Sequence, residues 1–104
     1  MPSPQINVEF AGGVELLFDN AKKLKVSLNS TDNSGNALKT LGDLLQTLKK
    51  SYIKQRPELF MQGDSIRPGI LVVINDCDWE LMGGLNYALE AGDKVVFIST
   101  LHGG

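Results

Sequence analysis

Cysteine and histidine are nearly absent, which excludes several kinds of site. Cys77 has no second cysteine with which to form an internal disulfide, which fits a reducing compartment. His102 is the only histidine, so the usual sets of cysteine and histidine zinc ligands cannot be assembled. Cys77 also stands between Asp76 and Asp78, and these acids disfavour the thiolate that a catalytic cysteine needs. We predict no metal site and an exposed, non-catalytic thiol.

An excess of basic charge and long apolar runs are also missing. The net charge is −2 and the pI is about 5.2, which is unsuited to binding nucleic acid by neutralising phosphates. No apolar run approaches the roughly 20 residues that cross a bilayer. Residues 1–5 lack the basic and apolar regions of a signal peptide. We expect a protein of the cytoplasm, and also of the nucleus, with no membrane contact and no direct contact with nucleic acid.

Catalytic sequence motifs are absent as well. The chain has no serine elbow, no phosphate-binding loop and no dinucleotide fingerprint, and its acids are scattered. We therefore predict that the chain is not an enzyme. The 104 residues, 42% hydrophobic and 21% charged, suit one domain with a real core. We place this domain at residues 1–100, followed by a flexible tail at 101–104, and expect a monomer.

The first half of the chain predicts two strands and one helix. Residues 5–10 and 23–28 alternate between apolar and polar side chains, which is typical of half-buried strands, and glycines between them suggest a hairpin. Residues 14–18 form an apolar extension whose register the pattern does not fix. Thr40 and Asp43 have the spacing of a capping box that starts a helix. One apolar stripe follows at helical spacing: Leu41, Leu44, Leu45, Leu48, Tyr52 and Ile53.

The second half predicts two more strands. Pro68 and Gly69 have the residue types of a type II turn, and the apolar strand 70–74 follows them. The last strand, 94–100, is apolar on both faces, which predicts a central position, parallel to the first strand. This order indicates an α+β roll with one helix across a mixed sheet. A single helix can cover only one face of the sheet. The other face is then either a contact surface for a partner or a surface that the connection 76–89 covers.

The chain closes on Gly103 and Gly104, directly after the predicted last strand. A terminal pair of glycines can be a frayed end without function. Because glycine has no β-carbon, the pair can also thread a cleft too narrow for side chains. The free carboxylate of Gly104 could then attack ATP to give an acyl-adenylate, which a thiolate or sulfide would capture.

Longer motifs resemble the ubiquitin-related modifier family of eukaryotic sulfur carriers over nearly the whole chain. The segments that carry the resemblance are Glu58-Leu59-Phe60, Asp64-Ser65-Ile66-Arg67-Pro68-Gly69-Ile70, Asn75-Asp76-Cys77-Asp78-Trp79-Glu80-Leu81 and Phe97-Ile98-Ser99-Thr100-Leu101-His102-Gly103-Gly104. A further segment, Leu89-Glu90-Ala91-Gly92-Asp93-Lys94-Val95, is similar also to bacterial carriers for thiamine and molybdopterin synthesis.

The resemblance implies a β-grasp fold and a carrier role. An activating enzyme of the ubiquitin-activating type would adenylate Gly104 with ATP, and its rhodanese-like domain would convert the carboxylate into a thiocarboxylate. A separate thiolase complex would pass the sulfur to the wobble uridine of cytosolic transfer RNAs. Gly104 would also become attached to lysines of target proteins. Leu101, His102 and Gly103 would form the tail that enters the activating enzyme, and the carrier itself would hold no cofactor.

Two other hypotheses remain open at the level of the residues. A non-covalent ubiquitin-like binding module would need a surface patch and would tolerate loss of Gly104. A small thiol enzyme would depend on Cys77.

Overall fold

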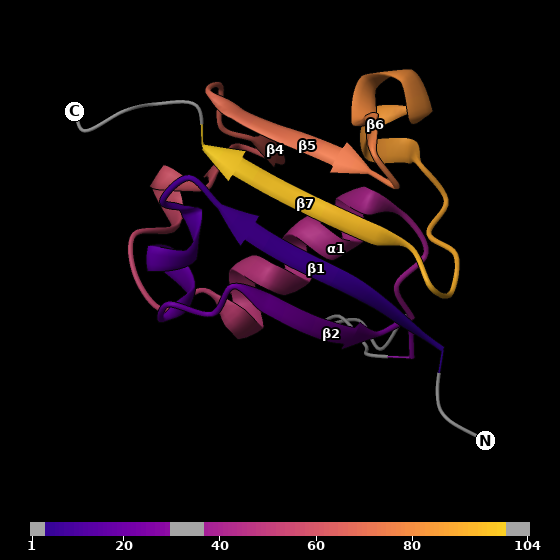
Figure 1. The fold of residues 1–104 in the computed structure, drawn as a ribbon, viewed down its shortest axis with the longest axis horizontal. Coiled ribbons are helices and arrows are strands. Elements are labelled where there is room, and N and C mark those ends of the chain that lie inside the picture. The colour runs from indigo at the N-terminus through magenta and orange to yellow at the C-terminus, as the bar shows by residue number, and fades with distance from the viewer. Residues whose placement is uncertain (1–3, 30–36, 100–104) are drawn as a thin grey trace.

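The computed structural model describes residues 4–29 and 37–99. Figure 1 shows a mixed sheet with one main helix packed across it. The strands are β1 (Gln5–Ala11), β2 (Lys23–Ser27), β3 (Met61–Gln62), β4 (Ser65–Ile66), β5 (Ile70–Ile74), β6 (Cys77–Asp78) and β7 (Lys94–Ser99). The helical segments are η1 (Val14–Phe18), α1 (Leu41–Thr47), the π-helical η2 (Leu48–Tyr52), η3 (Pro57–Leu59), η4 (Trp79–Met82) and η5 (Gly84–Asn86).

The main sheet has the strand order β2-β1-β7-β5-β6, and β3 and β4 form a separate pair. β1 pairs with β2 antiparallel and with β7 parallel, so the predicted hairpin and the predicted central, parallel last strand are confirmed. β5 pairs antiparallel with the other side of β7. The turn before β5 has Gly69 at a φ of 99° and an Ile70 N–H that donates to the Arg67 carbonyl at 3.2 Å, as predicted for type II.

The helix begins as the sequence predicts. The Thr40 hydroxyl accepts from the Asp43 N–H at 3.3 Å, and the Asp43 carboxylate accepts from the Thr40 N–H at 3.0 Å. After Thr47 the helix changes to the π-helical turn η2, where the Ile53 N–H donates to the Leu48 carbonyl at 2.8 Å. The helix ends at Tyr52, so the assignment of Ile53 to the helical stripe is wrong: its backbone is already extended, with φ −70° and ψ 136°.

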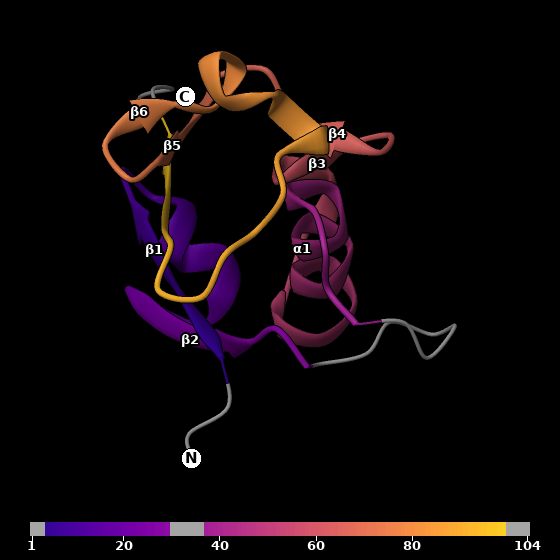
Figure 2. The same ribbon diagram turned by 90° about the vertical axis from the view of Figure 1, so that its right-hand side faces the viewer.

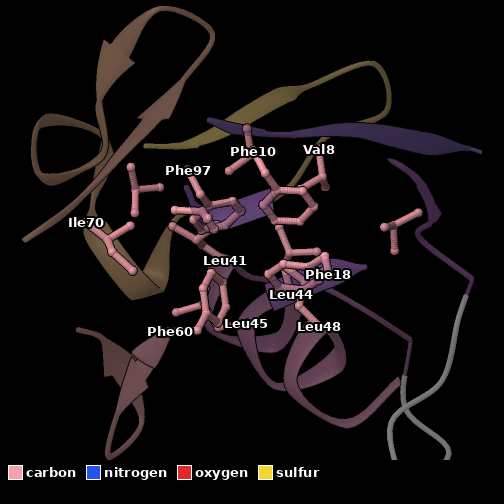
Figure 3. Close-up of a cluster of buried hydrophobic side chains, with 14 of the residues drawn as sticks. Val8, Phe10, Phe18, Leu41, Leu44, Leu45, Leu48, Phe60, Ile70 and Phe97 are labelled. Atoms are coloured by element: carbon pink, nitrogen blue, oxygen red, sulfur yellow. The ribbon is translucent and has the colours of Figure 1, made fainter. Parts of the chain in front are cut away.

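The core lies between this helix and the inner face of the sheet. Four leucines of the predicted helical stripe, Leu41, Leu44, Leu45 and Leu48, have no exposed surface. Figure 3 shows the rings of Phe10, Phe18, Phe60 and Phe97 meeting between the sheet and the helix. The Phe10 and Phe18 rings are stacked at 4.0 Å, and Phe60 meets Phe18 and Phe97 edge-on.

Residues 14–18, whose register the sequence left open, form the short 3-10 helix η1 rather than an extension of the hairpin strands. This helix buries Val14, Leu17 and Phe18 against one end of the core. Among the described residues, no helix is long and apolar enough to span a membrane.

Candidate functional site

The strand that leads to the predicted functional tail, β7, lies at the centre of the sheet. It pairs with β1 on one side and with β5 on the other, and Val95 and Phe97 are fully buried. Central strands open only when much of the fold opens, because their backbone hydrogen bonds are shielded on both sides. β7 is therefore a rigid base for whatever follows Ser99, its last residue.

The residues predicted to carry the chemistry lie outside the described residues. These are Gly104 and the predicted entry tail of Leu101, His102 and Gly103. Their roles remain predictions, and the structure describes the base from which they continue.

A buried carboxylate holds the other end of β7. Asp93 is 5% exposed and stands directly before the strand. Its Oδ1 accepts from the Asn75 side chain at 2.9 Å, and its Oδ2 accepts from the Tyr87 hydroxyl at 2.7 Å and from the Glu90 N–H at 2.8 Å. The Asn75 side-chain oxygen in turn accepts from the Lys94 N–H at 2.9 Å. These bonds fix β7 to the β5–β6 turn and to the long connection that precedes it.

The same contacts change the acidity of Tyr87. The pKa of its hydroxyl is raised from 10.0 to about 12; burial is the largest cause, and the hydrogen bond to Asp93 and the charges of Asp93 and Glu90 supply the rest. The tyrosine therefore stays neutral and donates to Asp93 throughout the physiological range. The sequence gave no sign that Asp93 is the partner of Tyr87, because a Gly-Asp turn is usually exposed.

The outer face of the sheet, opposite the helix, is basic at the end where β7 begins. Strand register places Lys25, Asn7 and Lys94 in one row across three strands, and Lys23 and Glu9 in the next. These side chains surround a shallow hollow of about 470 Å³. Lys94 also lies 3.5 Å from the carboxylate of Asp76. The hollow is thus lined by three lysines on a chain whose net charge is negative.

The outer face becomes apolar toward the end where β7 finishes. Val96 lies beside Val73 of β5, and the next row joins Ala11, Ile98 and Leu71. Leu71 is 38% exposed, and Val73, Val96 and Ile98 are half-buried. We call these five residues the outer apolar patch. It lies at the base of the predicted tail.

The connection 76–89 does not cover this outer face. Figure 2 shows it arching over the space between the sheet and α1, on the helix side. The Leu41 N–H donates to the Tyr87 carbonyl at 3.0 Å, and Trp79, Met82 and Leu85 pack against the core. The alternative in which this connection shields the second sheet face is therefore wrong. It closes the helix side, and no described segment lies over the outer apolar patch.

The described residues offer little catalytic chemistry of their own. No group of three or more histidine, cysteine or acidic side chains among them is placed to hold a metal ion. Cys77 is exposed, as predicted, and lies in the edge strand β6. The arrangement that remains is a rigid strand with an exposed apolar patch beside its end.

Comparison with known proteins identifies this arrangement. The sequence matches the family described as Urm1 (Ubiquitin related modifier) over residues 5–104. The chain belongs to the ubiquitin-related modifier family. It is 57% identical to ubiquitin-related modifier 1 of Gallus gallus over 99 residues, which cover 95% of this chain and 94% of that protein.

Solved structures of the same shape agree with this family. The solution structure of Urm1 from Trypanosoma brucei has a TM-score of 0.78 and 45% identity, and the match covers 100% of this chain and 99% of that one. A chain in the crystal structure of the Amycolatopsis orientalis BexX/CysO complex has a TM-score of 0.68, covering 95% of this chain and 99% of its own, and at 15% identity it shows the fold alone. The β-grasp prediction is confirmed. Ubiquitin-related modifiers are small ubiquitin-like modifiers and sulfur carriers, not catalysts themselves.

Proposed function

We propose that this chain carries sulfur on Gly104 for the 2-thiolation of the wobble uridine in cytosolic transfer RNAs. An activating enzyme would adenylate Gly104 with ATP and convert it into a thiocarboxylate through a rhodanese-like domain. The same glycine would form isopeptide bonds with lysines of target proteins. The observation that supports this most is the family match, which runs through residue 104 and so includes both terminal glycines.

The chemistry needs only the carboxylate from the carrier. A carboxylate oxygen of Gly104 attacks the α-phosphorus of ATP, and pyrophosphate leaves. The outer sulfur of a persulfide on the activating enzyme would then attack the acyl carbon, and AMP would leave, giving an acyl disulfide. A second thiolate of the enzyme would attack the enzyme's own sulfur of this acyl disulfide, which forms an enzyme disulfide and releases the thiocarboxylate of Gly104. Leu101, His102 and Gly103 would lie in the entry channel of that enzyme, where glycine fits because it has no side chain.

The outer apolar patch is the surface that we assign to the activating enzyme. It is exposed, it lies at the end of β7 that leads to the tail, and the described segments leave it uncovered. A carrier that docks there would bring its tail to the enzyme with the rest of the fold turned away. The chain similar to this one in the BexX/CysO structure belongs to a complex, which supports a docking role for the fold.

The division of work among the partners follows from charge. A chain with a net charge of −2 is poorly suited to hold transfer RNA, so RNA binding is assigned to the thiolase complex. Transfer to cytosolic RNA would place the carrier in the cytoplasm, with a nuclear fraction as a second location.

Intact mass spectrometry tests the proposal directly. The chain is incubated with the activating enzyme, ATP and a sulfur source, and replacement of one oxygen by sulfur at the C-terminus is the expected result. Deletion of Gly104 should abolish both this mass change and transfer RNA thiolation, whereas Cys77→Ser should leave both largely intact. Unchanged thiolation after the glycine deletion would contradict the carrier function.

A non-covalent binding module is the second candidate, and the outer apolar patch is the observation that favours it. Such a module would bind its partner equally well without Gly104. An unchanged mass under conditions where a known carrier is converted would decide for this candidate.

A further inference from the structure

The turn that follows β1 lies against the end of β7. Ala11 and Ile98 form the last parallel pair between the two strands, which puts Gly12 beside Ser99. A β-carbon on Gly12 would overlap the Ser99 carbonyl oxygen and lie 3.1 Å from its nitrogen and 3.3 Å from its carbonyl carbon. All three atoms belong to the backbone, so no change of side-chain rotamer could relieve the overlap.

The chain around Gly12 is anchored in the core. Ala11 is held in the sheet on one side, and η1 buries Val14 and Phe18 on the other. Gly12 has a φ of +68°, a conformation that residues with a β-carbon rarely adopt. Because Gly12 is fixed from both directions, a side chain there would act on Ser99.

Ser99 is the last residue of β7 and pairs with Ile70 across the neighbouring strand. Its backbone thus lies between the Gly12 turn and the first residue of β5. A displacement of Ser99 would change the direction in which the chain continues. Gly104 is the fifth residue after Ser99, which confines its carboxylate to within about 17 Å of Ser99, so a displacement of Ser99 shifts the point from which the tail reaches the enzyme.

We propose that Gly12 is a positioning residue for the activation of Gly104, and this inference rests on the proposed function. Gly12 allows the backbone of the β1 turn to lie directly on Ser99 and thereby sets the point and direction of tail exit. It touches none of the reacting atoms. Its effect should therefore appear in the rate of adenylation once the carrier is bound, and not in docking through the outer apolar patch.

The matched pair Gly12→Ala and Gly63→Ala tests this proposal. Gly63, between β3 and β4, has a φ of +64°, close to that of Gly12, and a β-carbon there would meet nothing within 4 Å. Both variants place alanine at a positive φ of similar size, and Gly12→Ala alone presses on Ser99. Adenylation is followed by pyrophosphate exchange, with the activating enzyme and the full chain.

We expect Gly12→Ala to lower kcat at least tenfold with KM changed less than threefold, and Gly63→Ala to stay within twofold in both. A chain that is merely less stable would show the reverse, because a smaller folded fraction raises the apparent KM and leaves kcat intact. Equal kinetics for the two variants would overturn the proposal. Loss of folding in Gly12→Ala alone would also overturn it, since Gly12 would then be a determinant of folding.

A structural measurement separates this inference from the proposed function. Residual dipolar couplings of the Ile98 and Ser99 amides should change in Gly12→Ala and not in Gly63→Ala. If the unaltered chain is not adenylated at all, the proposed function fails, and the couplings alone decide the positional role of Gly12. Unchanged couplings at both amides would contradict it.

Discussion

The two faces of the sheet are built from similar residues and have different surroundings. On the inner face, Val72 and Phe97 are fully buried beneath the helix. On the outer face of the same strands, Leu71 and Ile98 lie side by side, and Leu71 keeps 38% of its surface exposed. Consecutive residues of one strand therefore differ in role: one is buried and stabilises the fold, and the next is available to a partner.

This difference shows why apolar character alone does not define a core. Each apolar side chain on the inner face gains the free energy of burial when the chain folds. On the outer apolar patch, part of the free energy of burial is released only when a partner covers the surface, and so contributes to binding and not to folding. Substitutions on the two faces should therefore be read out by different measurements.

The largest loss of stability is expected on the inner face. Phe97→Ala removes a ring that contacts Phe10 and Phe60 and has no exposed surface, so it should lower the free energy of unfolding by about 3–5 kcal/mol. Ile98→Ala, the next residue on the outer face, should cost about 1 kcal/mol. Urea unfolding measures both. Equal losses would mean that the two faces are buried to the same extent in solution.

A charge on the outer apolar patch should affect binding more than stability. Leu71→Glu would place a carboxylate on the proposed docking surface, at its most exposed residue, and weaken binding to the activating enzyme by roughly 30-fold, the effect of about 2 kcal/mol expected at an important contact. Its effect on unfolding should stay near 1 kcal/mol.

Leu81→Glu is the control for this experiment. Leu81 is 84% exposed but lies on η4, off the sheet, so the same change of charge should leave affinity within about twofold. Calorimetric titration of each variant with the enzyme gives the comparison. Equal weakening by both variants would contradict the assignment of the outer face.

The smallest effect concerns the connection that closes the inner side. Tyr87→Phe removes the hydrogen bond to Asp93 and should cost about 1.5–2 kcal/mol at neutral pH. The folded state raises the pKa of Tyr87 from 10.0 to about 12, so between these values it retains a proton that the unfolded chain releases. This contribution is present below pH 10 and is lost as the pH rises through about 12.

Urea unfolding at several values between pH 8 and about 12 tests this dependence. The difference between the unaltered chain and Tyr87→Phe should shrink as the pH rises through about 12. A constant difference for Tyr87→Phe would mean that the hydroxyl and Asp93 do not interact in solution.

Much of the fold could be predicted because its signals are local. Alternation identified β1 and β2, the spacing of leucines identified the helix, and Thr40 with Asp43 marked its start. The type II turn at Gly69 was likewise readable from two residues. The 3-10 helix at Val14–Phe18 was not, since five apolar residues in sequence carry no period that separates helix from strand.

The residues of the candidate site also differ in whether the sequence could predict them. The family match extends through residue 104 and so supports Gly104 as the functional residue, although its chemistry remains a prediction. Asp93 escaped detection because the signal that defines it, three donors around one buried carboxylate, comes from residues up to 18 positions away along the chain. Gly12 read as an ordinary turn glycine, because the Ser99 backbone that it touches is 87 positions later (99 − 12).

The sequence by itself determined the class of fold, the central place of the last strand and the family, because periodicity and local motifs depend on neighbouring residues. Only the tertiary structure decided which side of the sheet the connection 76–89 closes, and hence that Leu71 and Ile98 remain open at the base of the tail. The physical reason is that apolar residues on the two faces of a strand have the same sequence signature. Which face becomes covered depends on how distant segments pack.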